Sequence, residues 1–387
     1  MNRTLALLCI GLLMTLSAVS QTATQKRRKV SGPASADSRI PIDITNWSIQ
    51  TGQAELTTYL GEPAIHILPN AKPLLVKTVS FTNGTIEYDF IPEDPRFAGM
   101  YFRRQDADES EYIYLRTAQV GNSAAMDAIQ YAPYLKGVLI WDLMDQFQAP
   151  VPLFKKGEWN HIKLVVSGSQ MRAYVNDMQR PVLEVPRLEG DVKQGGIAFE
   201  GAGYIKNLVV NPNQTEDLPA IEGYDPTRHD PRYVRAWQVS EPTPLPIGQE
   251  VLPAHFPKPE TIWQPLFAER YGLVNLSRQF GISNERRLVW LRTKIKVNTA
   301  QKRRVSLGFS DDVWVFVNEE PVFTDKNTYR APAMRKTPDG RISIENGSFD
   351  LPLKTGKNEV LVGLANNFFG WGLIARFDSV EGIEVLP

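Results

Sequence analysis

Cysteine is almost absent from this chain of 387 residues, which holds one cysteine and four histidines. The single cysteine, Cys9, lies inside an apolar run near the N-terminus. The rest of the chain therefore has no thiol nucleophile, no disulfide and no metal site built from cysteine.

An excess of charge of either sign is also missing, because 43 basic side chains balance 43 acidic ones. A protein that binds nucleic acid or an anionic membrane through long-range attraction usually carries a positive excess. The one basic cluster, residues 26–29, lies among Ser, Ala and Pro and is interpreted as part of a solvated linker. We therefore expect no nucleic-acid partner.

Long hydrophobic runs are missing as well, since a membrane span needs roughly 20 apolar residues. The longest run, residues 5–16, follows Arg3 and precedes small residues that end at Ser20. This pattern is typical of a secretory signal peptide. We expect residues 1–20 to be a signal cleaved near Ser20, residues 21–39 to be a flexible lead segment, and the protein to be secreted or periplasmic without a membrane span.

Short β-type runs dominate the part of the chain between residues 43 and 210. They are rich in Val, Ile, Tyr and Phe and are separated by Gly, Pro, Asn and Asp. Many short strands at this spacing predict an all-β sandwich. The expected strands are 64–68, 85–91, 99–103, 112–117, 138–143, 161–166, 171–175, 196–200 and 205–210.

A second β-rich block follows a polar stretch with prolines, residues 211–230, that reads as a linker. Residues 241–265 are rich in proline, which argues against central strands there. The chain is longer than one core usually serves, so two all-β domains are predicted, 40–212 and 233–387, joined by a linker over 213–232. The second block's expected strands are 288–297, 304–309, 313–317, 341–344, 359–365, 373–377 and 382–385.

Residues 157–177, GEWNHIKLVVSGSQMRAYVND, show the clearest local pattern in the chain. Apolar residues alternate on both sides of the turn SGSQ, which predicts a β-hairpin with one buried face. His161 has no carboxylate and no second histidine near it in sequence, so we interpret it as structural.

This hairpin resembles one that recurs in the concanavalin A-like lectin/glucanase superfamily, in its laminin G-like branch. The segments FTNGTIEYDFIPED (81–94) and GGIAFEGAGYIKNLVV (195–210) are similar to other strands of that superfamily, so the resemblance covers about residues 42–210. It implies a β-sandwich. It does not imply one function, because lectins, hydrolases, lyases and adhesion modules share this fold.

One catalytic pattern of that fold can be tested directly. The resemblance to family 16 glycoside hydrolases would require two catalytic carboxylates in the pattern E-x-D-x-x-E. Glu87 and Asp89 begin it, but Pro92 occupies the last position. The pattern is broken, and we expect Glu87 and Asp89 to lie on the outer face of an edge strand.

A more promising site lies between residues 102 and 143. Ile113 and Leu115 have the parity of core residues, which places Tyr112, Tyr114 and Arg116 together on the opposite face of their strand. Aromatic rings stack on sugars and guanidinium groups bind hydroxyls or carboxylates. The following loop and strand add the other expected ligand contacts: Asp127, Gln130, Tyr131, Tyr134 and Trp141.

Two alternatives stay open for this segment. In the first, the tyrosines and Trp141 are half-buried packing residues and Arg116 pairs with Asp127. In the second, the face is catalytic, and a polysaccharide lyase fits best, because Tyr can act as base and acid while Arg and Gln neutralise a uronate. The 3-keto-disaccharide hydrolase family shares the hairpin, but none of its catalytic residues can be transferred to this chain.

The second block resembles a galactose-binding-like jelly roll, a sugar-binding module of many secreted glycosidases, in residues 234–242, 308–323 and 351–377. Asp311 and Asp312 offer oxygen ligands for a structural calcium ion, although adjacent acids in a turn are more often solvated or capping groups. Phe369 and Trp371 are expected to form a secondary sugar platform or, alternatively, a buried plug.

The sequence therefore predicts an exported, noncatalytic carbohydrate-binding or glycan-utilisation accessory protein, whose partner is an extracellular polysaccharide or oligosaccharide. No catalytic residue and no cofactor are assigned. The alternatives are a glycoside hydrolase or polysaccharide lyase on the concave face of the first domain, and an adhesion module for a protein partner.

Overall fold

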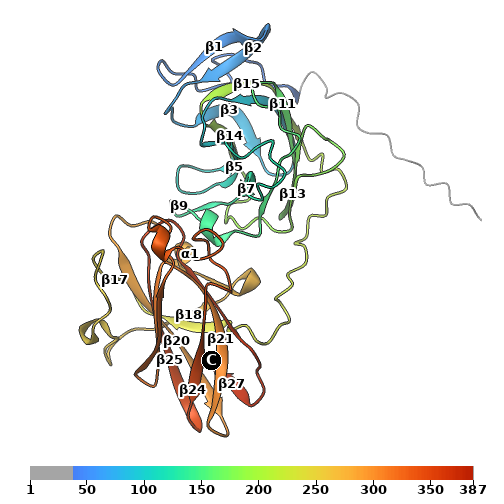
Figure 1. Ribbon diagram of the computed structural model, residues 1–387. Helices are drawn as coiled ribbons and strands as arrows, with labels where there is room; N and C mark the ends of the chain where they lie inside the picture. The colour runs from blue at the N-terminus through green and yellow to red at the C-terminus, as the bar shows by residue number, and fades with distance from the viewer. Residues whose placement is uncertain (1–37, 387) are drawn as a thin grey trace, which may run out of the picture.

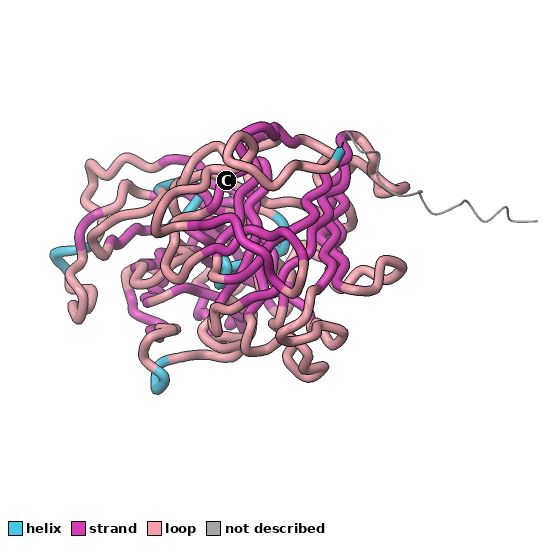
Figure 2. Tube along the Cα trace, turned by 90° about the horizontal axis from the view of Figure 1, so that it is seen from above, coloured by secondary structure: helices cyan, strands magenta, loops and turns pink. Residues whose placement is uncertain are grey.

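The computed structural model describes residues 38–386, which form two all-β domains placed end to end (Figure 1). The expected signal peptide and most of the expected lead segment lie outside the described residues. Strands make up most of the regular structure, and the helical segments are short and lie in connections (Figure 2). No helix among residues 38–386 is long and apolar enough to cross a membrane.

The first domain is a sandwich of two antiparallel sheets and a small hairpin. The seven-stranded sheet has the order β1 (Ala54–Tyr59), β2 (Glu62–Ile67), β15 (Gly203–Pro212), β4 (Gly84–Pro92), β11 (Asn160–Ser167), β12 (Gln170–Val175) and β13 (Leu183–Val185). The six-stranded sheet has the order β10 (Gln148–Ala149), β7 (Ile129–Tyr131), β6 (Glu111–Arg116), β5 (Phe97–Arg104), β14 (Gly195–Glu200) and β3 (Leu74–Phe81). The hairpin consists of β8 (Tyr134–Leu135) and β9 (Val138–Leu139).

The core of this domain fills the space between the two sheets. Met100 and Phe199 from the six-stranded sheet are almost fully buried, as is Ile86 from the seven-stranded sheet. The ring of Tyr88 meets that of Phe199 edge-on, with centroids 4.9 Å apart. Alternation of inward and outward side chains along each strand then decides which residues face away from the core.

The second domain is also built from two antiparallel sheets. One holds β18 (Gln264–Phe267), β16 (Ala236–Val239), β20 (Arg287–Val297), β25 (Gly356–Ala365), β22 (Asp312–Val317) and β23 (Glu320–Lys326), with β17 (Thr243–Pro244) and β27 (Ile383–Leu386) paired to β20. The other has the order β19 (Leu273–Asn275), β26 (Gly372–Phe377), β21 (Gln301–Ser310) and β24 (Gly347–Leu353). The prediction of two all-β domains is confirmed, and the proline-rich stretch holds only the two-residue β17 and the start of the edge strand β18.

Two expected strands are wrong. The run 138–143 leaves the sheet after Leu139 and forms the 3-10 helix η2 (Trp141–Leu143). Residues 341–344 form no strand, because the buried Ile342 packs into the first domain's core and its N–H donates to the Asp142 carbonyl at 2.8 Å. Both segments lie at the domain junction, where docking replaces sheet pairing.

The segment between β15 and β16 descends along one side of both domains (Figure 1). It packs against the outer face of the seven-stranded sheet, where buried Leu218 joins Val165 and Tyr174. Lys163 pairs with Glu216 at 2.9 Å. Lys163 is therefore covered by the segment that the sequence suggested to be a linker.

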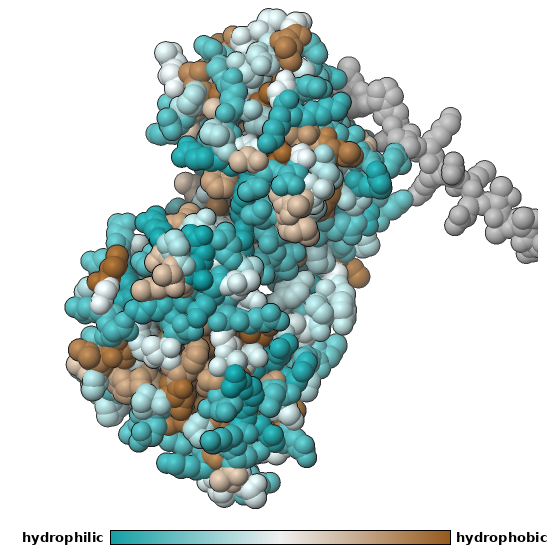
Figure 3. Space-filling model, in the orientation of Figure 1, coloured by the Kyte–Doolittle hydropathy of each residue, from teal (hydrophilic) through white to brown (hydrophobic). Residues whose placement is uncertain are grey.

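The two domains are held together by a polar and apolar junction. Leu273, Ile342 and Ile374 of the second domain belong to the same buried cluster as the first domain's core. In η2, the Asp142 carboxylate accepts the Gly370 N–H at 2.9 Å. Arg278 adds an ion pair with Asp191 and donates to the carbonyl of Glu189 at 2.7 Å. The outer surface, by contrast, is largely hydrophilic in the view of Figure 3.

At Gly370 the junction leaves no room for a side chain. A Cβ placed there would lie 2.4 Å from Asp142 Oδ1 and 2.5 Å from Leu143 Cγ. We expect Gly370→Ala to lower the free energy of unfolding by about 1–3 kcal/mol, the usual cost of overpacking. Chemical denaturation measures this change.

Gly196→Ala is the matched control, because its Cβ would meet nothing nearer than the Arg104 carbonyl at 3.7 Å. Equal stability of the two variants would show that the loop moves aside without cost, and that the junction is not closely packed at this point.

Candidate functional site

Strand register gathers four polar aromatic and acidic side chains on the outer face of the six-stranded sheet. Tyr101 on β5 lies opposite Tyr112 on β6, and Gly99 lies opposite Tyr114. On the other side of β5, Gly99 also lies opposite Glu200 of β14. Directly opposed residues of neighbouring strands share a face. Tyr101, Tyr112, Tyr114 and Glu200 therefore all face away from the core of the sandwich.

Glu200 is the centre of this face. Its carboxylate accepts a hydrogen bond from the Tyr101 hydroxyl at 2.5 Å on Oε2 and another from the Tyr112 hydroxyl on Oε1. Glu200 is partly exposed. Each oxygen of an ionised carboxylate has two lone pairs, so both still have acceptor capacity toward a ligand.

The tyrosine rings form a stack beside this carboxylate. The ring centroids of Tyr101 and Tyr112 are 4.4 Å apart, and those of Tyr112 and Tyr114 are 5.1 Å apart. The β8–β9 hairpin brings Tyr134 to 5.8 Å from Tyr101 and 6.0 Å from Tyr112. This hairpin explains why Tyr112, although on an outer face, is only 2% exposed.

Burial sets the protonation of these hydroxyls. It raises the pKa of Tyr101 and Tyr112 far above the usual value, and the negative charge of Glu200 adds to the rise. Burial also raises the pKa of Tyr114 to about 12, although Arg116 opposes the shift. All three hydroxyls therefore stay protonated near neutral pH, and two of them act as hydrogen-bond donors to Glu200.

Arg116 continues the row toward the second domain. Its guanidinium donates to the Asp127 carbonyl at 2.7 Å, to Gln130 Oε1 at 2.7 Å and to the Tyr114 hydroxyl at 3.1 Å. It also forms an ion pair with the Asp127 carboxylate at 3.5 Å. The amide of Gln130 is anchored in turn on the carbonyl of Trp141 at 2.7 Å. The guanidinium is thus held in one orientation by groups from two strands and a loop.

Trp141 joins this row to the second domain. The guanidinium of Arg116 lies 5.9 Å from its ring centroid and that of Arg341 lies 5.2 Å away. Arg341 also binds the Asp127 carboxylate at 3.2 Å. On the second domain's side, Tyr329 meets the Trp141 ring edge-on at 5.2 Å and Phe369 at 6.0 Å.

The structure brings together seven of the eight predicted ligand contacts, but not as an open sugar platform. Tyr112, Tyr114 and Gln130 are 2%, 4% and 0% exposed. Their burial and the Arg116–Asp127 ion pair match the alternative of packing. Other groups on this face remain accessible: Phe97, opposite Arg116, is 47% exposed, and Tyr134, Arg116, Asp127 and Glu200 are partly exposed. The seven predicted residues that lie together are Tyr112, Tyr114, Arg116, Asp127, Gln130, Tyr134 and Trp141.

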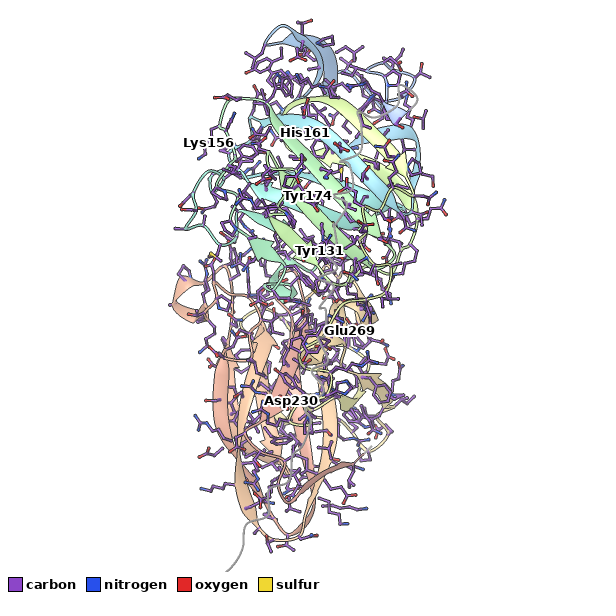
Figure 4. All side chains as sticks on the ribbon, turned by 90° about the vertical axis from the view of Figure 1, so that its right-hand side faces the viewer. Tyr131, Lys156, His161, Tyr174, Asp230 and Glu269 are labelled. Carbon is purple, nitrogen blue, oxygen red and sulfur yellow. The ribbon has the colours of Figure 1, made fainter. Side chains whose placement is uncertain are left out.

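Tyr131 does not belong to this face. It lies opposite Ile113 in the sheet, so it points into the sandwich. Its hydroxyl donates to Glu111 Oε2 at 2.6 Å and accepts the Glu189 N–H at 2.6 Å. Figure 4 shows Tyr131 at the end of the first domain that meets the second. Tyr131 was expected to contact a ligand, but in the structure it has a structural role in the core.

The sequence interpretation missed Tyr101 and Glu200. Both lie at the outward parity of strands that were expected, with Met100 and Phe199 as their inward neighbours. Parity alone could have placed them on an outer face. It could not have shown that β14, β5 and β6 are neighbours, since that order is not read from local sequence.

The two ligand contacts predicted for the second domain differ in their exposure to solvent. Phe369 is 41% exposed at the junction, whereas Trp371 is 1% exposed. Trp371 packs against Phe280 and lies under the guanidinium of Arg287 at 5.3 Å. Trp371 is therefore the buried plug of the alternative interpretation and offers no ring face to a sugar.

The two adjacent acids of the second domain do not converge on a common point. Asp311 accepts the Phe368 N–H at 2.8 Å, and Asp312 forms a buried ion pair with Arg286. Within residues 38–386, no group of three or more His, Cys, Asp or Glu side chains is arranged to hold a metal ion. Both carboxylates thus serve internal contacts, which gives no support to the expected calcium site.

A second cluster of ionisable groups lies on the outer face of the seven-stranded sheet. His161, labelled in Figure 4, is on the first domain. Its ring nitrogens contact Asp89 at 2.7 Å and Glu87 at 3.2 Å, both on the neighbouring strand β4. Hydrogen bonds to Asp89 and Glu87 raise the His161 pKa to about 9. The strand β4 is an inner strand of its sheet, so the expectation of an edge strand is wrong. The carboxylate partners of His161 are distant in sequence, which is why the sequence did not reveal them.

Comparison with known proteins finds a family model that is similar to the first domain. The model of the 3-keto-alpha-glucoside-1,2-lyase-like domain matches residues 42–211. This range coincides with the first sandwich, which is therefore a carbohydrate-related β-sandwich. A search of curated proteins gives no match.

Solved structures also match parts of this chain. A carbohydrate binding module from Bacillus subtilis has a TM-score of 0.29 and 15% identity, covering 43% of this chain and 92% of that one. Domain 4 of an extracellular arabinanase from Geobacillus stearothermophilus, in complex with arabinotriose, has a TM-score of 0.27 and 14% identity, covering 43% and 82%. An anti-sigma factor domain-containing protein has a TM-score of 0.26 and 11% identity, covering 88% and 90%.

Asp142, next to Trp141, makes the base of this face sensitive to pH. Burial raises the pKa of Asp142 from 3.8 to about 7, although the Gly370 N–H and Arg341 oppose the shift. The folded protein therefore holds this proton at pH values where the unfolded chain has released it, so the free energy of unfolding falls as pH rises from about 4 to 7. Asp142→Asn keeps an acceptor for Gly370 but does not ionise. We expect the free energy of unfolding of the wild type to fall between pH 4 and pH 8 by about 1–4 kcal/mol more than that of Asp142→Asn.

Urea denaturation at several pH values measures this difference. Asp350→Asn is the control, because Asp350 is exposed on the second domain. Parallel stability curves for Asp142→Asn and the wild type would contradict the shifted ionisation of Asp142.

Proposed function

We propose that the outer face of the six-stranded sheet binds carbohydrate, and that the protein is an exported, noncatalytic glycan-binding protein. The observation that supports this proposal is the Glu200 carboxylate, partly exposed and held by two tyrosine hydroxyls in line with Arg116. The family match of the first domain to a carbohydrate-related model points in the same direction. In this proposal the first domain is laminin G-like, the second is a galactose-binding-like jelly roll, and the partner is an extracellular polysaccharide or oligosaccharide.

The chemistry of the face suits hydroxyl-rich ligands. An ionised carboxylate accepts hydrogen bonds from sugar hydroxyls, and a guanidinium donates to hydroxyl or carboxylate oxygens. Tyr134 offers a partly exposed ring beside them. Because Tyr101 and Tyr112 hold Glu200 in place, the carboxylate loses little conformational freedom when a ligand binds, which favours affinity.

Binding to a panel of neutral and acidic oligosaccharides, measured by calorimetry on the mature protein, tests this function. Glu200→Gln removes the charge but keeps the size of the side chain, and we expect it to weaken binding at least tenfold, the range for a lost charge-assisted hydrogen bond. Glu87→Gln is the matched control, because Glu87 is a partly exposed acid on the other sheet. Unchanged affinity in both Glu200→Gln and Tyr134→Ala would place binding elsewhere.

A second candidate function is catalysis at the same face, and Glu200 is the observation that favours it. A 1,2-lyase acting on a 3-keto-glucoside removes the proton from carbon 2, which is acidified by the neighbouring ketone. The bond from carbon 1 to the leaving oxygen then breaks, a double bond forms between carbons 1 and 2, and the leaving oxygen takes a proton. In this chain Glu200 would accept the first proton. Tyr134, whose pKa is raised by burial and by Glu200, would supply the second.

Incubation with 3-keto-glucosides and with the parent glucosides tests catalysis. A lyase produces an unsaturated ketone that absorbs ultraviolet light, only from the oxidised substrates. We expect Glu200→Gln to lower such a rate at least a hundredfold, the usual contribution of a general base, and Glu87→Gln to leave it unchanged. Ligand retention without any absorbing product in the wild type would exclude the lyase and leave the binding function.

A further inference from the structure

The second domain presents an aromatic cluster where it meets the candidate face. The rings of Tyr329 and Phe368 lie parallel at 5.4 Å, and Phe369 stands edge-on to Phe368 at 4.4 Å. Trp141 of the first domain contacts both Tyr329 and Phe369. The cluster therefore continues the row that runs from Glu200 through Arg116 to Trp141.

These aromatic residues are accessible, unlike Tyr112 and Tyr114 of the first domain. Phe369 is 41% exposed, and Tyr329 and Phe368 are partly exposed. Tyr112 and Tyr114 are buried under the β8–β9 hairpin and their neighbours. The second domain thus adds the exposed ring of Phe369 to the accessible rings of Phe97 and Tyr134 on the first domain's face.

Arg330 adds an uncommitted positive charge to the cluster. Its guanidinium lies 4.3 Å from the ring centroid of Phe368, and Arg330 itself is exposed. Within residues 38–386, this contact is the only polar or charged interaction of its side chain. Neighbouring cations are already paired: Arg335 with Asp339 at 2.8 Å, Lys336 with Asp325 at 2.7 Å, and Arg341 with Asp127 at 3.2 Å. Arg330 is therefore the cation of this cluster that remains free for a ligand.

The two loops that carry the cluster are held in position from beneath. Asp311 accepts the Phe368 N–H at 2.8 Å, and Asp142 accepts the Gly370 N–H at 2.9 Å. Arg335 donates to the carbonyl of Tyr329 at 2.8 Å. A preformed platform loses little freedom on binding, which suits ligand recognition.

We propose that Tyr329, Phe368, Phe369 and Arg330 form an outer subsite for an anionic sugar residue of an extended acidic glycan, whose other residues occupy the face around Glu200. The proposal rests on the binding function proposed above and extends it across the domain junction. The exposed ring of Phe369 packs against the C–H face of the sugar, Tyr329 and Phe368 support it, and Arg330 pairs with the anionic group through parallel N–H donors. A carboxylate and a sulfate share this chemistry.

Oligosaccharides that differ only in length and charge test the subsite. The probes are an oligouronate of two and of six residues, a sulfated oligosaccharide of six residues, and a neutral one of six residues. We expect Arg330→Gln to weaken binding of the charged hexasaccharides about tenfold, the effect of one charge-assisted contact, and to reduce the salt dependence of that binding. Binding of the disaccharide and the neutral hexasaccharide should not change. A larger loss with the uronate than with the sulfated probe identifies a carboxylate as the anion, and the reverse identifies a sulfate.

Two further variants separate the subsite from the function on which it rests. Phe369→Ala should weaken binding of all hexasaccharides, and Glu200→Gln should weaken binding of every ligand, the disaccharide included. Arg180→Gln is the matched control, because its side chain is 81% exposed on the first domain.

Three results would overturn the proposal. If only Glu200→Gln weakens binding, the outer subsite is wrong and the first face stands. If only Arg330→Gln and Phe369→Ala weaken binding, the face around Glu200 is not the continuation of the site. If no variant changes binding of any probe, both the subsite and the proposed function are wrong.

Discussion

The hydrogen bond between Asp142 and the Gly370 N–H is the constraint on which the arrangement of the site depends. It joins η2, which follows the β8–β9 hairpin, to the loop that carries Phe368 and Phe369. The absence of a side chain at residue 370 allows the approach, since a Cβ would collide with Asp142. Through this contact, the orientation of Trp141 and the exposure of Phe369 are fixed by the same junction.

The acidic side chains of the site have different partners. These partners distinguish carboxylates with a structural role from one that is accessible to a ligand. Asp142 and Asp311 are buried, receive backbone N–H donors and have raised pKa values, mainly because burial disfavours their charge. Asp127 pairs instead with Arg116 and Arg341. Glu200 receives only protonated tyrosine hydroxyls as side-chain partners among the described residues, and it keeps contact with solvent. A partly exposed carboxylate held by neutral donors can still pair with a cation or hydroxyl of an external ligand, whereas the Asp127 carboxylate is already paired with two guanidinium groups.

The sequence predicted features that depend on local alternation and failed where distant segments meet. The parity of Ile113 and Leu115 placed Tyr112, Tyr114 and Arg116 correctly, because a strand's two faces follow from its own residues. Tyr131 was assigned to the wrong face because its pairing with Ile113 depends on how β7 aligns with β6 across a loop. The carboxylate partners of His161 and the tyrosines beside Glu200 lie on neighbouring strands. Sequences with a similar local pattern can fold with a different strand order, so these contacts could not be predicted. The helix η2 and the loop at Ile342 replaced expected strands because interdomain burial outweighed their β-type composition.

The two aromatic groups of the site have different physical roles. The stack of Tyr101, Tyr112 and Tyr114 is nearly closed to solvent, so its hydroxyls act on neighbouring side chains: two orient Glu200, and that of Tyr114 receives a hydrogen bond from Arg116. Burial of those rings stabilises the sheet and fixes polar groups, but leaves no ring face for a sugar. Tyr329, Phe368 and Phe369 lie on loops of the other domain and keep part of their surface in water. The Glu200 carboxylate and the exposed ring of Phe369 thus lie on different domains. A ligand that uses both has to be long enough to cross the junction, which makes chain length the property of the glycan that this architecture can recognise.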